Sequence, residues 1–234
     1  MSIHIEDKTK LVNSVFTKVY EKYDFMNDVM SLGIHRVWKK NMIDWMRPRK
    51  NTKLIDVASG TGDLAKIFNK KTNSSCKIFC VEPNKNMLEM GKDKLKKHKN
   101  IFWELAPAEE LPFKSDTFDF YSISYGIRNV TNIEKCLKEA LRVLKPGGRF
   151  MCLEFSKVEN ELLSKAYSKY SKLIPLIGKL VLGNPEPYEY LVSSIDKFYN
   201  QEQLSKLMKD NGFNSVEFRN LSNGISAIHS GWKI

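Results

Sequence analysis

One segment constrains the fold of this chain more than any other. It combines a strand, a glycine turn, a helix and a second strand that ends in an acid. Residues 54–57 resemble a buried strand that carries Asp56, and Gly60-Thr61-Gly62 follows as a tight turn into a helix. Glycine tolerates positive φ and has no Cβ atom, so a ligand can approach the backbone N–H groups of such a turn. Glu82 ends the next strand, where a carboxylate can bind both hydroxyls of a ribose. The unit therefore predicts a site for an adenosine-type cofactor.

The acids decide between kinds of adenosine cofactor. The spacing of Gly60, Gly62 and Ala65 also matches the loose fingerprint of nicotinamide and flavin dinucleotide sites. Asp56 argues against a dinucleotide, because a second carboxylate at the turn would repel a pyrophosphate. It favours a cofactor that carries cations, such as the ammonium and sulfonium groups of S-adenosylmethionine.

Strands and helices alternate from 53 to 155, which predicts an α/β fold with ligands at the carboxyl ends of parallel strands. Pro146-Gly147-Gly148 is interpreted as a turn between a helix and the next strand. The expected strands are 53–57, 77–82, 101–105, 118–123, 149–155, 213–220 and 224–233. Between 53 and 155 we expect three helices: one that begins at residue 62, one at 85–97 and one at 132–144.

The chain is expected to form a single domain, 1–234, in four parts: a helical lead-in at 8–47, a cofactor-binding core at 53–155, a helical substrate cap at 160–200, and a helix with a strand pair at 204–234. Residues 160–182 are apolar but contain lysines and Pro175, which argues against a transmembrane helix. Two interpretations of this segment are equally good. It is either a helix packed on its own domain or an apolar lid in peripheral contact with a membrane.

Charge, histidine and cysteine content limit the classes of partner and metal site that we expect. Lys and Arg number 38 against 27 Asp and Glu, a net charge of +11, yet no nucleic-acid-binding motif accompanies them, so we predict no nucleic acid partner. The histidines lie far apart and the cysteines form no C-x-x-C pair, so we predict no metal site. The N-terminus lacks a secretory or transit composition, which predicts a cytoplasmic protein.

Several longer segments carry a family resemblance. They are Tyr23-Asp24-x-Met26-Asn27, the turn from Asp56 to Asp63, Ser124-Tyr125-Gly126-Ile127-Arg128-Asn129-Val130, Arg142 to Gly148, and Leu153-Glu154-Phe155-Ser156. From about residue 11 to the C-terminus the chain resembles the UbiE-type ubiquinone/menaquinone biosynthesis C-methyltransferases. The resemblance implies a class I S-adenosylmethionine-dependent methyltransferase with a doubly wound, mostly parallel seven-stranded sheet and a C-terminal antiparallel strand. It also implies methylation of a ring carbon of a polyprenylated benzoquinol, or of demethylmenaquinol.

The resemblance also assigns site residues. S-adenosylmethionine is expected to contact Asp56 and the Gly60-Thr61-Gly62 turn, Glu82 at the ribose, Pro107 and Ala108 beside the adenine, and Ser124. Pro107 departs from the family, which usually has Asn or Asp there, so adenine recognition is expected to rest on backbone groups and Glu109.

The methyl acceptor is expected on the other side of this pocket. Arg128 is the predicted partner of the phenolate oxygen, directly or through water, with Tyr23, Asp24, Asn27 and Asn129 on the substrate side. The alternatives are that Asp24 and Asn27 cap a helix and that Arg128 forms a structural ion pair. Two other functions stay open: methylation of another apolar acceptor, and a non-catalytic scaffold. A homodimer, a quinone-biosynthesis complex and peripheral attachment to the inner membrane are also open.

Overall fold

The computed structural model describes residues 12, 14, 17, 28, 31, 33–182 and 185–234, without the side chains of 177, 178 and 180–182. In this part of the chain, one sheet has the strand order β3-β2-β1-β4-β5-β7-β6. Its strands are β1 (Lys53–Val57), β2 (Lys77–Val81), β3 (Ile101–Glu104), β4 (Phe118–Ser124), β5 (Leu144–Phe155), β6 (Asn214–Leu221) and β7 (Ser226–Trp232). The first five strands are parallel, and β7 is antiparallel to both of its neighbours. The predicted fold class is confirmed.

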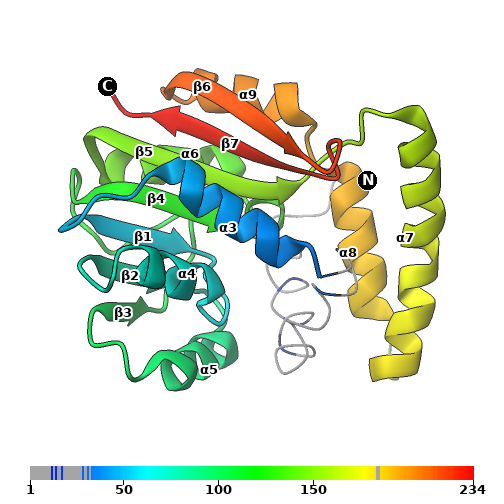
Figure 1. Cartoon of the computed structure of the whole chain (residues 1–234), viewed down its shortest axis with the longest axis horizontal. Coiled ribbons are helices and arrows are strands. Elements are labelled where there is room, and N and C mark those ends of the chain that lie inside the picture. The colour runs from blue at the N-terminus through cyan, green and yellow to red at the C-terminus, as the bar shows by residue number, and fades with distance from the viewer. Residues whose placement is uncertain are drawn as a thin grey trace.

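Helices cover both faces of the sheet (Figure 1). On one face, α3 (His35–Met46) and α4 (Asp63–Lys71) pack in a core with Trp38, Phe68 and Leu54. On the other, α6 (Ile133–Val143) and α9 (Gln201–Asp210) pack against strand residues such as Ile55 and Phe150. Strand β1 contributes alternate side chains to the two cores, as expected for a strand buried on both faces.

Two further helices stand beyond the carboxyl ends of the parallel strands (Figure 1). They are α7 (Glu161–Leu182) and α8 (Glu186–Lys197), which pack against each other. Together they occupy the predicted 160–200 insertion. None of the helices in the described ranges has the length and apolarity needed to cross a membrane.

The Pro146-Gly147-Gly148 segment differs from the prediction. Instead of forming a turn before a strand at 149, it lies within β5, which already begins at Leu144. Pairing with β4 is irregular there, because Phe118 pairs with Leu144 but Phe120 pairs with Arg149. The Gly147 N–H donates to the Lys233 carbonyl at 2.8 Å, so a distant segment binds the backbone that local rules assign to a turn.

Asparagine N-caps fix the start of the two helices that follow the site-bearing loops. Asn84 precedes α5 (Lys85–Leu95), and its side chain accepts from the N–H groups of Asn86 and Met87. Asn132 caps α6 in the same way. Such caps satisfy N–H groups that have no partner inside the helix, and they fix the loops that follow β2 and β4.

Candidate active site

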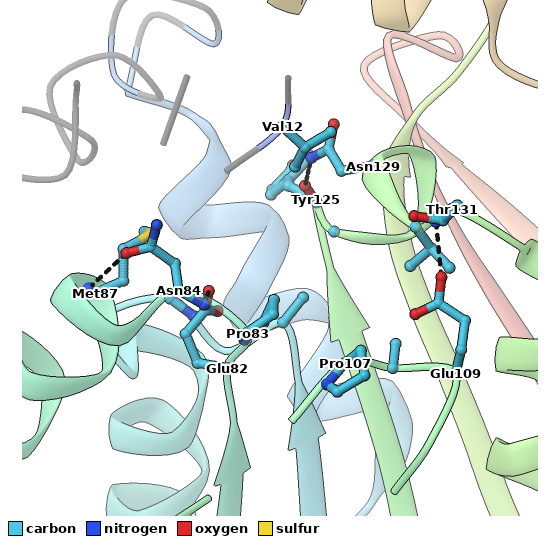
Figure 2. Close-up of a pocket in the computed structure, with 15 residues that line it drawn as sticks. Val12, Glu82, Pro83, Asn84, Met87, Pro107, Glu109, Tyr125, Asn129 and Thr131 are labelled. Atoms are coloured by element: carbon cyan, nitrogen blue, oxygen red, sulfur yellow. Dashed lines mark hydrogen bonds between the residues drawn. The ribbon is translucent and has the colours of Figure 1, made fainter. Parts of the chain in front are cut away.

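A pocket opens at the carboxyl ends of β1, β2 and β4 (Figure 2). This is the edge of a doubly wound sheet at which ligands are expected. The lining residues come mainly from the loops after these strands: Ala58 and Gly60, then Glu82, Pro83, Asn84 and Met87, then Tyr125, Gly126, Asn129, Val130 and Thr131, together with Val12, Pro107, Ala108 and Glu109. Of the predicted site residues, Gly60, Glu82, Pro107, Ala108 and Asn129 line this pocket.

Glu82, one of two acidic residues in the pocket lining, is only 5% exposed. One carboxylate oxygen accepts from the Gly60 N–H at 2.9 Å, and the other accepts from the Asn84 N–H at 3.0 Å. Burial raises the pKa of Glu82 to about 7, although the two backbone bonds oppose that shift. A carboxylate has about four acceptor positions, so both oxygens retain capacity for ligand hydroxyls.

The ends of β1 and β4 approach each other closely at the pocket floor. Ala58 and Tyr125 both have positive φ, 51° and 57°, which L-residues seldom adopt. A Cβ atom on Gly126 would lie 2.5 Å from the Cβ of Ala58, so only glycine fits there. Such strain tends to occur at ligand sites, and both strained residues line the pocket.

Asp56 lies within the sheet and does not line the pocket. It is 1% exposed, and one oxygen accepts from the Ser122 hydroxyl at 2.7 Å. The other oxygen has no hydrogen-bond partner among the described residues. Burial raises the pKa of Asp56 to about 7. Its direct contact with a cofactor cation stays a prediction.

Thr61, Gly62 and Ser124 also lie outside the pocket lining. Thr61 accepts from the Lys94 ammonium at 3.2 Å. Gly62 has φ 84°, and a Cβ there would come within 2.7 Å of Leu95. These two residues therefore hold the glycine turn against α5. The Ser124 hydroxyl is buried without a hydrogen-bond partner in the described part of the chain, and its predicted cofactor contact is not tested.

Glu109 connects the loop after β3 to the loop after β4. One of its carboxylate oxygens accepts from the N–H groups of Thr131 and Asn132 at 2.8 and 3.1 Å. It thereby holds two neighbouring walls of the pocket together, beside Pro107 and Ala108. An adenine contact of Glu109 stays a prediction.

Arg128 lies behind the pocket in a buried ion pair. Its Nη1 atom is 2.6 Å from a carboxylate oxygen of Glu154 and donates to the Tyr125 carbonyl at 2.8 Å. The two side chains are 3% and 1% exposed. This geometry corresponds to the structural alternative for Arg128, and its role at a phenolate oxygen, directly or through water, stays a prediction.

Asn129 faces the pocket one residue later, at the end of the short 3-10 helix η2 (Ile127–Asn129). Its amide nitrogen donates to the Tyr125 carbonyl at 3.5 Å, a bond drawn in Figure 2. Its amide oxygen accepts from the Tyr190 hydroxyl of α8 at 3.1 Å. Asn129 thus joins the pocket to the helical insertion.

Tyr23, Asp24 and Asn27 lie outside the described residues, and their predicted roles stay predictions. Sequence reasoning missed the loop residues Ala58, Pro83, Asn84, Met87, Tyr125, Gly126, Val130 and Thr131 as pocket lining. Their position directly after predicted parallel strands was the available signal. In the described ranges, no three His, Cys, Asp or Glu side chains are grouped so as to hold a metal ion.

Comparison with known proteins places this geometry in a family. The model of the ubiE/COQ5 methyltransferase family matches residues 3–233. This chain belongs to that family. Similar relatives include Ubiquinone/menaquinone biosynthesis C-methyltransferase UbiE of Cereibacter sphaeroides, 47% identical over 97% of this chain and 92% of the relative. The enzyme of the same name from Rickettsia bellii is 48% identical over 99% of this chain and 96% of the relative.

Solved structures support the fold. A SAM-dependent methyltransferase of Thermotoga maritima, described as a possible histamine N-methyltransferase, has a TM-score of 0.67 at 20% identity, covering 95% of this chain and all of that one. Phosphoethanolamine N-methyltransferase 2 of Haemonchus contortus, solved with S-adenosyl-L-methionine, has a TM-score of 0.64 at 15% identity, covering 84% of this chain and 52% of that one. At these identities the likeness concerns the fold alone.

Proposed function

We propose that this family member uses S-adenosylmethionine to methylate a ring carbon of a 2-methoxy-6-polyprenyl-1,4-benzoquinol, of demethylmenaquinol, or of both, in ubiquinone and menaquinone biosynthesis. The observation that carries the proposal is near-half identity to the UbiE enzymes along almost the whole chain. The pocket supports the proposal, because its lining includes an acid that can bind ribose hydroxyls, Glu82, and a side-chain amide, Asn129.

The pocket residues fit the cofactor. Glu82 has acceptor capacity for two ribose hydroxyls beyond its bonds to the Gly60 and Asn84 N–H groups. Pro107 and Ala108 offer apolar surface for an adenine ring. When bound, S-adenosylmethionine supplies a methyl group made electrophilic by its sulfonium. The chain contributes alignment of the two substrates, which can lower a barrier by about 7–11 kcal/mol.

The acceptor must become nucleophilic at its ring carbon. A phenol with a pKa near 10 is ionised in only about one molecule in a thousand at neutral pH, so the site has to favour the phenolate. Asn129 can donate an amide N–H to that oxygen, while Arg128 adds positive charge nearby from its ion pair. Arginine stays charged in proteins and is a poor proton acceptor. Tyr23, Asp24 and Asn27 are proposed to shape the acceptor side.

Expression in a strain that lacks its own quinone C-methyltransferase tests the function. We expect mass spectrometry of the extracted quinones to show a ring-methylated ubiquinone or menaquinone, and its identity names the acceptor class. Persistence of the demethyl precursor, despite measured binding of S-adenosylmethionine, contradicts the proposal.

The outer face of α7 is proposed to contact an anionic membrane surface. Its residues 162, 166, 169, 173 and 176 share one helical stripe, and Leu162, Leu173 and Leu176 on it are 79%, 54% and 60% exposed. Exposed lysines accompany the leucines: Lys165, Lys169, Lys172 and Lys179. Apolar side chains next to lysines are typical of helices that lie in a membrane interface. A homodimer or a larger complex stays a prediction.

Vesicle sedimentation tests this contact. Wild-type protein is expected to bind anionic vesicles more than neutral ones, and less as salt increases. The double variant Lys169→Glu with Lys172→Glu should no longer sediment with anionic vesicles. Lys97→Glu with Lys99→Glu, an equal charge change on exposed residues elsewhere, should not. Identical partitioning with and without anionic lipid removes the proposal.

A further inference from the structure

The helical insertion is attached to the active-site loop by two side-chain bonds. The Tyr190 hydroxyl donates to the amide oxygen of Asn129 at 3.1 Å, and Arg128 Nε donates to the Ser194 hydroxyl at 3.4 Å. Tyr190 and Ser194 are four residues apart and so lie on one face of α8. Of these two bonds, only the one from Tyr190 reaches a side chain that lines the pocket.

These contacts determine which way the Asn129 amide points. A backbone carbonyl only accepts, so the amide group facing the Tyr125 carbonyl must be Nδ2, and the amide oxygen must face Tyr190. The Tyr190 hydroxyl therefore has to donate. Nδ2 carries two N–H groups, and the one not directed at Tyr125 has no partner among the described residues.

The Tyr190 hydroxyl can serve as a constant donor. It is part-buried, and this burial raises its pKa above the ordinary value of tyrosine, with Glu154 adding to the rise and Arg128 opposing it. It therefore keeps its proton throughout the neutral range. A hydrogen bond to an amide oxygen also polarises the amide and strengthens its N–H groups as donors.

We propose that Tyr190 is a positioning residue, which orients the Asn129 amide so that one Nδ2–H is presented to the ring oxygen of the methyl acceptor. The proposal rests on the proposed function, because a hydroxylated ring supplies that oxygen. It assigns to α8 a part in the reaction beyond covering the substrate. If this is correct, removing the Tyr190 hydroxyl slows methyl transfer and leaves the binding of S-adenosylmethionine unchanged.

Tyr190→Phe removes the hydroxyl and keeps the ring. We expect kcat with a short-chain 2-methoxy-6-prenyl-1,4-benzoquinol to fall about tenfold, equivalent to about 1.4 kcal/mol, because loss of an oxyanion donor itself costs more. The Kd of S-adenosylmethionine and the KM of the quinol should stay near their wild-type values. In an Asn129→Ala background the same change should cost nothing further, since the amide it orients is gone.

Tyr188→Phe is the matched control on the same helix. The Tyr188 side chain is fully buried, and its hydroxyl has no hydrogen-bond partner among the described residues, so its removal should leave kcat unchanged. An equal loss of kcat in Tyr188→Phe overturns the proposal, as does an undiminished loss from Tyr190→Phe in the Asn129→Ala background.

A second readout separates this inference from the function on which it rests. The side-chain amide signals of Asn129 in a ¹⁵N–¹H spectrum, assigned by their loss in Asn129→Ala, should shift in Tyr190→Phe and stay in place in Tyr188→Phe. Unchanged Asn129 signals in Tyr190→Phe overturn the positioning role by themselves. If Tyr190→Phe shifts these signals but the wild-type protein fails to methylate the quinol, the proposed function is contradicted instead, and the orientation of the amide stays supported.

Discussion

Glu82→Ala is expected to weaken S-adenosylmethionine binding by about a hundredfold or more. The carboxylate would accept two ribose hydroxyls, and hydrogen bonds to a charged group contribute about 1.5–3 kcal/mol each. Its two backbone partners, the N–H groups of Gly60 and Asn84, would also lose their acceptor and with it the shape of the pocket. Isothermal titration calorimetry measures the change in Kd.

Two further variants control for effects on the fold. Glu82→Gln keeps the side-chain volume and one neutral acceptor for one of the two N–H groups, so it should disturb the fold less than Glu82→Ala and bind the cofactor with intermediate affinity. Glu104→Ala removes an exposed carboxylate at the end of the neighbouring strand β3 and should bind normally. Wild-type affinity in a folded Glu82→Ala protein would show that the ribose lies elsewhere.

The same residue should make cofactor affinity depend on pH. Burial raises the pKa of Glu82 to about 7 in the free protein, and ribose hydroxyls favour the ionised form, so binding lowers that pKa and releases protons. Affinity should therefore fall as the pH drops from 8 to 6, by at most about tenfold per unit below the pKa. Titration of the cofactor itself is common to all variants. Glu82→Gln should lack the additional dependence.

The parts of the site that sequence predicts are those fixed by local pattern. Gly60 and Glu82 follow directly from a strand, a turn and a second strand, and parallel strands bring their ends to one edge. The insertion at 160–200 is also visible in sequence, because it breaks the alternation. The family resemblance adds Pro107, Ala108 and Asn129 to the pocket, where the structure places them.

The remaining parts depend on contacts between distant residues. Tyr190 and Asn129 are 61 positions apart, and the ion pair of Arg128 with Glu154 spans 26, so no local spacing predicts either contact. Gly147 illustrates the same limit, because its N–H donates to the distant Lys233 carbonyl and the apparent loop lies within a strand. Arg128 is the predicted phenolate partner, which stays a prediction, and its ion pair with Glu154 is a contact that local sequence does not show.

Glu154→Ala is expected to destabilise the fold by about 3–5 kcal/mol, because it leaves the buried Arg128 guanidinium without its counter-charge. Arginine cannot escape this cost by losing its proton. Arg128→Ala should cost less, since burial already raises the pKa of Glu154 and an unpaired carboxyl can become neutral. Urea unfolding measures both. Asp210→Ala breaks the exposed pair with Lys206 and should cost no more than about 1 kcal/mol.

Replacing both partners separates a structural role of Arg128 from a catalytic one. Arg128→Met combined with Glu154→Leu should recover most of the lost stability, because well-packed apolar side chains can replace a buried ion pair at little cost. If Arg128 stabilises the phenolate, this stable double variant binds S-adenosylmethionine but no longer turns over the quinol. Recovery of turnover together with stability would show that the arginine only holds η2 in place, and that Asn129 acts on the acceptor without it.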